Sequence, residues 1–169
     1  HRNGVDTIEH AIYLDEPTIE MLLEKDAVVV PTFAIVNVIM VFGRAAGLPE
    51  YAMKKAEESH KAHIASIRRA YQAGVKIALG TDFAGPLGVA HGDNAIELEI
   101  LVNQVGMSPM EAIASGTRIA AEALGLEEEI GTLSAGKQAD LLIVDGDPSQ
   151  DVSILKQKTA IELVMKSGE

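Results

Sequence analysis

Short apolar runs alternate along this chain with longer segments in which apolar residues recur every three or four positions. Runs such as Val28–Val30 are typical of strands buried on both faces, as in a parallel sheet. The longer segments have the period of amphipathic helices. This alternation predicts an α/β fold. The expected strands are Val5–His10, Ala27–Phe33 and Val75–Leu79, and the expected helices are 15–25, 49–73, 95–105 and 108–124, with 37–46 as a short helix or an active-site loop.

Capping residues mark several helix boundaries. Asp15 can accept a hydrogen bond from the first turn of the helix that follows it. Ser108 and Glu111 have the spacing of a capping box around Pro109. Gly74 follows the longest helical segment and is predicted to end it in a left-handed conformation.

The helical period disappears after Gly131. Ala139–Val144 and Thr159–Met165 are predicted strands, separated by a turn at Gly146-Asp147-Pro148. We therefore expect two parts, an α/β part over residues 1–128 and a small β-rich part over residues 129–169.

Composition narrows the functional classes. The chain has 169 residues, 47% of them hydrophobic, which is enough for a substantial core. It has no cysteine, so disulfides and thiolate metal ligands are excluded and any metal must be bound by histidine and carboxylate. The net charge of −11 argues against nucleic acid as a partner. No apolar run approaches a membrane span, so we expect no membrane partner. The lack of cysteine and of a visible signal segment fits a cytoplasmic protein.

Polar residues with metal-binding chemistry follow two of the predicted strands. His10 ends the first strand and Asp82 follows the third. Because parallel strands present their carboxyl ends at one edge of the sheet, the two side chains are expected at the same edge, as ligands of a divalent cation. Tyr13 and Thr32 follow strands at this edge and His91 lies in a glycine-rich loop, so all three are candidates for substrate contact.

Each candidate also has a structural interpretation. Asp82 could be a turn residue, Tyr13 and Thr32 could serve packing, and His91 could stabilise its loop. His60 and His63 lie on one face of the long helix and could bind a metal, but we expect a solvated histidine pair. Glu9, next to His10, is predicted to point to the opposite side of the strand, as a structural partner and not as a catalytic acid.

Six motifs occur in an order that resembles the C-terminal half of a metal-dependent amidohydrolase of the imidazolonepropionase or prolidase-like branch. They cover nearly the whole chain. The motifs are GVDTIEHA at 4–11, VVPTF at 29–33, AGVKIALGTD at 73–82, HGDNAIELEILV at 91–102, SPMEAIASGTRIAAEALGL at 108–126 and GTLSAGKQADLLIVDGDP at 131–148.

The resemblance implies strands six to eight of a (β/α)8 TIM barrel, followed by part of a composite β-sandwich. It places His10 as the sixth-strand metal ligand and Asp82 as the eighth-strand ligand and catalytic proton acceptor, with Zn²⁺ as the expected cation. The family's other ligands have no counterpart here, and His1 lies in the joint before the first strand and is not assigned.

The activity implied for an intact protein is hydrolysis of a carbon–nitrogen bond. A dipeptidase of Xaa-Pro type and a carboxypeptidase for basic C-terminal residues are the favoured readings, with an imidazolonepropionase-like cyclic amidase as the alternative. Three strands cannot close a barrel. We therefore expect a missing N-terminal half or self-association, and a non-catalytic fragment or assembly module stays open as a further alternative.

Overall fold

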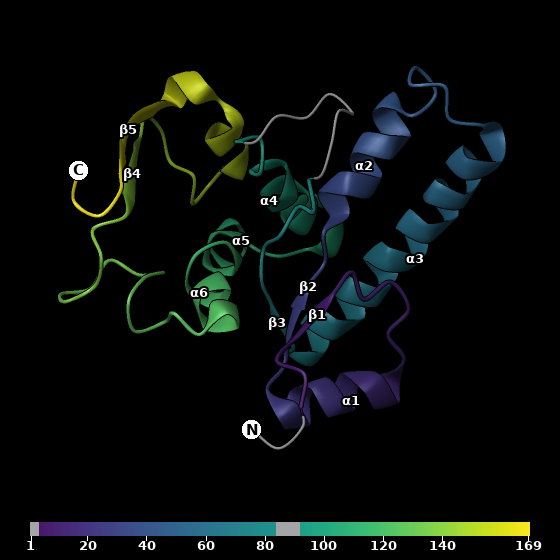
Figure 1. The fold of residues 1–169 in the computed structure, drawn as a ribbon, viewed down its shortest axis with the longest axis horizontal. Coiled ribbons are helices and arrows are strands. Elements are labelled where there is room, and N and C mark those ends of the chain that lie inside the picture. Colours follow the sequence, from purple (N-terminus) through teal and green to yellow (C-terminus); the bar gives the residue numbers. More distant parts are fainter. Residues whose placement is uncertain (1–3, 84–91) are drawn as a thin grey trace.

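A three-stranded parallel sheet forms the centre of the chain. The computed structural model describes residues 4–83 and 92–169. The strands are β1 (Thr7–Glu9), β2 (Val28–Val30) and β3 (Lys76–Ile77), in the order β1-β2-β3 (Figure 1). β2 is the middle strand and pairs with both neighbours through Val29, which lies opposite Ile8 on one side and Ile77 on the other. The three predicted strands are confirmed, although each is shorter than expected.

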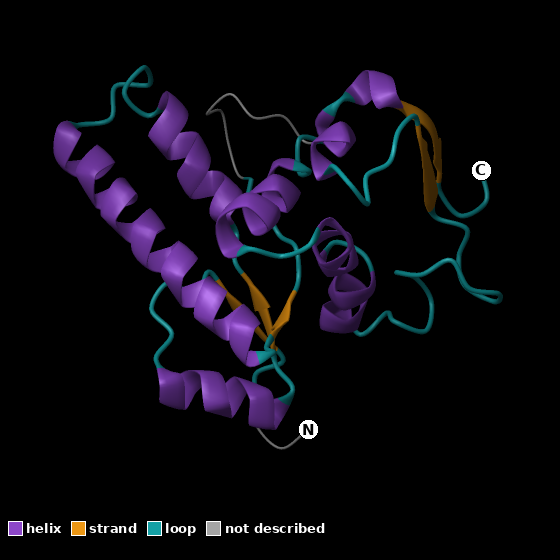
Figure 2. Cartoon of the chain, turned by 180° about the vertical axis from the view of Figure 1, so that it is seen from behind, coloured by secondary structure: helices purple, strands orange, loops and turns teal. Residues whose placement is uncertain are grey.

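Three helices follow the first two strands. They are α1 (Glu16–Lys25), α2 (Phe33–Phe42) and α3 (Glu50–Ala73), and α2 and α3 form a long hairpin that projects from the sheet (Figure 2). Asp15 caps α1 by accepting a hydrogen bond from Thr18 N at 3.0 Å, and Gly74 ends α3 with φ 95°. Among the helices of the described residues, none is long and apolar enough to cross a membrane.

The second group of helices differs from the prediction at two points. α4 (Ile96–Ile100) continues as a π-helix, η1 (Leu101–Val105). The segment predicted as one helix over 108–124 is two, α5 (Pro109–Ser115) and α6 (Arg118–Leu124). The capping box at the start of α5 is confirmed.

The break between α5 and α6 has a specific cause. The carbonyl of Ser115 accepts a hydrogen bond from Leu79 N at 2.9 Å, so it joins the helix to the segment after β3. Gly116 permits this approach, because a Cβ there would lie 3.3 Å from Leu79 Cδ1. A single straight helix would move both groups away from β3.

The C-terminal residues form an antiparallel pair, β4 (Leu141–Val144) with β5 (Ile161–Met165). Two short 3-10 helices, η2 (Val152–Lys156) and η3 (Lys158–Ala160), lie between the strands. Val152 is only 3% exposed and joins the main core, so this segment is anchored to the α/β part.

The helices cover one face of the parallel sheet. Val29 and Ile77 point into a core that also contains residues from α1, α3, η1 and α5, and Ile8 packs against it. Thr7 and Glu9 alternate with Ile8 and lie on the opposite face, where Thr7 Oγ1 donates to Glu9 Oε1 at 2.8 Å. Glu9 thus has a side-chain partner, Thr7, on the face of the sheet opposite the helices.

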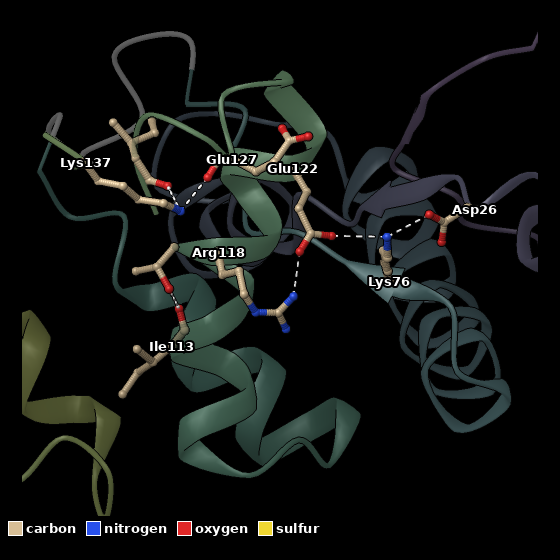
Figure 3. Close-up of polar contacts among 9 residues, drawn as sticks. Asp26, Lys76, Ile113, Arg118, Glu122, Glu127 and Lys137 are labelled. Atoms are coloured by element: carbon tan, nitrogen blue, oxygen red, sulfur yellow. Dashed lines mark hydrogen bonds and ion pairs between the residues drawn. The ribbon is translucent and has the colours of Figure 1, made fainter. Parts of the chain in front are cut away.

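Ion pairs fix α6 to the amino-terminal end of the sheet. Lys76 Nζ on β3 lies 2.9 Å from a carboxylate oxygen of Asp26 and 3.1 Å from one of Glu122, which also pairs with Arg118 at 2.6 Å (Figure 3). Lys137 reaches the carbonyls of Glu127 and Ile130 at the end of the same helical region. These charges neutralise one another at the amino-terminal end of the sheet, which is the end opposite His10 and Asp82.

We expect Ile67→Ala to destabilise the protein by about 2–5 kcal/mol, because a fully buried aliphatic side chain on α3 is replaced by a cavity. Urea unfolding measures the change. Val41→Ala is the control, since Val41 is 62% exposed and its truncation should cost much less. Equal losses in the two variants would contradict the assignment of the core.

Candidate active site

Three residues at the carboxyl ends of the three parallel strands share an unusual backbone conformation. His10 follows β1 with φ 67°, Thr32 follows β2 with φ 59°, and Asp82 follows β3 with φ 52°. Residues with a Cβ rarely adopt this left-handed region, which costs on the order of 1 kcal/mol each and is concentrated at functional sites. The strain therefore marks one edge of the sheet as a candidate site.

The imidazole of His10 is oriented by Thr32. Thr32 Oγ1 lies 2.6 Å from the carbonyl oxygen of Pro31 and 2.6 Å from His10 Nδ1. A hydroxyl that donates its one proton to the carbonyl accepts from His10, so we expect His10 to be protonated on Nδ1, with the lone pair of Nε2 left for a ligand. Metal-binding histidines use this arrangement, in which one ring nitrogen donates to a fixed partner and the other binds the ion.

The loop after β1 is held by the long helix α3. Ser66 Oγ is fully buried, donates to the carbonyl of Ala11 at 2.8 Å and accepts from Leu14 N at 2.9 Å. Arg69 adds a bond to the carbonyl of Leu14 at 2.8 Å. These contacts fix the two left-handed residues His10 and Ala11, and nothing in their sequence spacing indicates them.

Asp82 is brought to the same edge by a close approach of β3 to β2. Gly80 has no Cβ, and one built there would lie 2.5 Å from Val30 Cγ1. Thr81 is buried, and its hydroxyl lies 3.5 Å from Asn94 Nδ2. The Asp82 side chain itself is exposed, and within the described residues no hydrogen bond or ion pair joins it to His10.

The other predicted site residues have different surroundings. Tyr13 is 76% exposed on the loop after β1, so it is free to contact a ligand. Thr32 is 4% exposed and its hydroxyl already has two partners, which favours a role in orienting His10 over contact with substrate. His91 lies outside the described residues.

A buried carboxylate, Glu97, was missed by the sequence analysis. It is fully buried on α4, and its two oxygens accept from Phe33 N at 2.9 Å and Ala34 N at 2.7 Å. Burial raises the pKa of Glu97 to about 7, while the two backbone bonds act to lower it. Its position in the IELEI segment, between apolar residues of a helix, was the available signal.

The expected solvated histidine pair on α3 is wrong for His63. This residue is 1% exposed, its ring centroid lies 4.2 Å from that of Phe33, and neither ring nitrogen has a hydrogen-bond partner among the described groups. Burial lowers the pKa of His63 to about 4, so the ring is neutral at pH 7. His60 is half-buried and its Nε2 lies 3.0 Å from Gln104 Oε1.

The chemistry of His10 and Asp82 fits a divalent cation. The lone pair on His10 Nε2 and an exposed carboxylate at the same edge are ligands that Zn²⁺ accepts. No cluster of three or more histidine and acidic residues suitable for a metal occurs within residues 4–83 and 92–169. The described part of the chain thus contributes two candidate ligands.

Comparison with known proteins identifies relatives along the whole chain. Residues 2–169 match the Amidohydrolase family. The chain is 30% identical to ochratoxinase from Aspergillus niger over 98% of this chain and 34% of that protein. A crystal structure of a Xaa-Pro dipeptidase with bound methionine superposes with a TM-score of 0.83 and 34% identity, covering 98% of this chain and 39% of the dipeptidase.

A shorter match reaches an imidazolonepropionase from Rubrobacter xylanophilus, 36% identical over 60% of this chain and 24% of that protein. The chain therefore spans about a third of the length of the ochratoxinase that it matches over nearly its whole extent.

The His10 tautomer can be observed directly by ¹⁵N NMR of histidine-labelled protein. We expect the Nδ1–H form, and we expect Thr32→Val, which removes the acceptor at constant shape, to produce a mixture of tautomers. His10→Ala assigns the signal, and Thr18→Val, at an exposed position on α1, is the control. A wild-type signal from the Nε2–H form would overturn the assignment.

The titration of Glu97 predicts a pH-dependent stability. Its pKa is 4.5 unperturbed and about 7 in the folded protein. Below pH 4.5 the carboxyl of Glu97 is protonated in both the folded and the unfolded state, so its burial carries no penalty for ionisation. As the pH rises to 7 the unfolded state ionises first, and the free energy of unfolding falls by about 3 kcal/mol. The difference in unfolding free energy between wild type and Glu97→Gln should fall by this amount.

His63 has the opposite pH dependence, because its contribution to stability is lost as the pH falls from 6.5 to about 4. Both proteins contain His63, so its contribution cancels in the difference between their unfolding free energies. A difference that does not change with pH would show that burial does not raise the pKa of Glu97 in the folded protein.

Proposed function

The chain belongs to the amidohydrolase family, and we propose that the whole protein containing it is a metal-dependent hydrolase of carbon–nitrogen bonds. The observation that supports this most strongly is the 2.6 Å contact between His10 Nδ1 and Thr32 Oγ1, which directs Nε2 towards ligand binding at the edge of the sheet that also carries Asp82. The strained backbone at three neighbouring strand ends supports the same location.

In this proposal, β1, β2 and β3 are strands six to eight of a (β/α)8 barrel, over residues 1–128. Residues 129–169 are the C-terminal segment of a β-sandwich. The parallel order of the three strands and the helical cover on one face support the barrel assignment. The antiparallel β4–β5 pair supports the second assignment.

We propose that His10, through Nε2, and Asp82 would hold the divalent cation, with Zn²⁺ as the expected ion. When bound, such a cation polarises a substrate carbonyl and lowers the pKa of water to roughly 7. Asp82 takes a proton from the attacking water and returns it to the leaving nitrogen as the C–N bond breaks. Thr32 keeps His10 oriented, and Tyr13 and His91 are proposed to contact the substrate.

A linear amide, of the kind found in an Xaa-Pro dipeptide, is the proposed substrate class, with a peptide ending in a basic residue as the second linear option. The Xaa-Pro dipeptidase structure, which matches 98% of this chain at 34% identity, supports a linear amide. Imidazolonepropionases match 60–85% of this chain by sequence and support a cyclic amide as the alternative. The scarcity of metal ligands in the described segment keeps a non-catalytic module as the competing candidate.

We expect His10→Ala and Asp82→Asn in the whole protein to reduce hydrolysis of Xaa-Pro dipeptides at least about 100-fold, since each removes a ligand and the second also removes the proton acceptor. Metal content by mass spectrometry should fall in both. Asp6→Asn is the matched control, because it removes a carboxylate at the opposite end of β1.

Wild-type turnover in His10→Ala would contradict the proposed site. Turnover of a cyclic amide with none of dipeptides would favour the imidazolonepropionase-like alternative. Less than one bound ion per chain with no turnover of either substrate by the wild-type protein would favour the non-catalytic module.

A further inference from the structure

The helix that begins at the candidate site is not capped by its own N-cap residue. Thr32 occupies the N-cap position of α2, where a threonine hydroxyl ordinarily accepts a hydrogen bond from the first turn of the helix. Its side chain makes no such bond: the backbone of Thr32 is left-handed and not extended as in an ordinary N-cap, and Oγ1 contacts Pro31 and His10 instead. The first amide groups of α2 therefore need another acceptor.

Glu97 supplies that acceptor from a distant part of the chain. Its carboxylate binds Phe33 N and Ala34 N, the two amides that follow Thr32, across a separation of more than 60 residues. An acidic side chain is also favoured at a helix N-terminus by the helix dipole. The capping function that Thr32 has given up is thus performed by α4.

Water cannot replace Glu97 at this position. Phe33 and Glu97 are fully buried, and the Phe33 ring packs against His63, which is 1% exposed. Because Thr32 occupies the N-cap position, its hydroxyl is the local side-chain acceptor for the first turn of α2 once Glu97 is removed. A hydroxyl drawn to that role would leave His10 Nδ1 without its partner.

We propose that Glu97 is a positioning residue of the active site: by capping α2 it leaves the Thr32 hydroxyl free to orient His10. The expected effect on catalysis rests on the proposed function. The expected effect on the orientation of His10 is independent of it. Glu97 acts through Thr32 and is not itself in contact with His10.

The test uses Glu97→Gln in the whole protein, with two readouts. The ¹⁵N signals of His10 should change from the Nδ1–H form to a mixture of tautomers. With an Xaa-Pro dipeptide as substrate, kcat should fall about 10- to 100-fold, the range typical of residues that orient a metal ligand, with a smaller change in KM.

Glu99→Gln is the matched control. Glu99 lies on the same helix and pairs at the surface with Lys156, so the substitution makes the same chemical change without touching α2. It should leave both the His10 tautomer and kcat as in the wild type.

A double mutant separates positioning from general stability. In Thr32→Val the hydroxyl is already absent, so adding Glu97→Gln should lower kcat by less than twofold more, while a purely structural role predicts that the two losses multiply. A Glu97→Gln protein that melts at a lower temperature but keeps the wild-type His10 tautomer and kcat would overturn the proposal.

Glu97→Asp provides the same test if Glu97→Gln does not accumulate as folded protein. The shorter carboxylate keeps the charge but is withdrawn from the amides, so His10 should again show mixed tautomers, and a wild-type tautomer would overturn the proposal. Wild-type turnover in His10→Ala would instead refute the proposed function, so the two failures are distinguishable.

Discussion

The hydrogen bond between His10 Nδ1 and Thr32 Oγ1 is the contact on which the candidate site depends. A histidine at a strand end can rotate about two bonds and exchange tautomers, so its position in the sequence alone does not make it a ligand. The hydroxyl of Thr32, fixed in turn by the carbonyl of Pro31, removes both freedoms. The left-handed backbone at His10 and Thr32 brings the two side chains together and is maintained against its cost by the surrounding bonds.

Beneath this contact lies a group of buried polar residues that would be costly in an ordinary core. Glu97 and His63 are both essentially inaccessible to solvent. Burial raises the pKa of Glu97 and lowers the pKa of His63, so it favours the neutral form of each. Between them lies Phe33, whose amide binds Glu97 and whose ring packs on His63. Apolar residues of the same size would avoid the desolvation cost. The retention of two titratable groups here is consistent with a role in holding the turn that carries Thr32.

Sequence analysis predicted the elements and the edge of the sheet because those depend on local patterns. The strand runs, the Asp15 cap, the Ser108 capping box and the Gly74 terminator all involve residues within a few positions of one another. The burial of His63 and the contacts of Glu97 and Ser66 could not be predicted, since each depends on which distant segment packs against it. The division of the helix at Gly116 has the same origin, because it follows from a bond to Leu79.

The segments that carry both proposed ligands are held against the middle strand, β2. His10 is oriented by Thr32 at the end of β2, and its own amide donates to Val30 at 2.8 Å. On the other side, Ala78 N donates to Val29 at 2.9 Å and Gly80 allows the segment leading to Asp82 to lie against Val30. Neither ligand belongs to β2, yet each is held against it. A change in the conformation of the turn after β2 would therefore disturb His10 directly, whereas Asp82 depends on the packing of the strand itself. We therefore expect the capping of α2 to matter more for His10 than for Asp82.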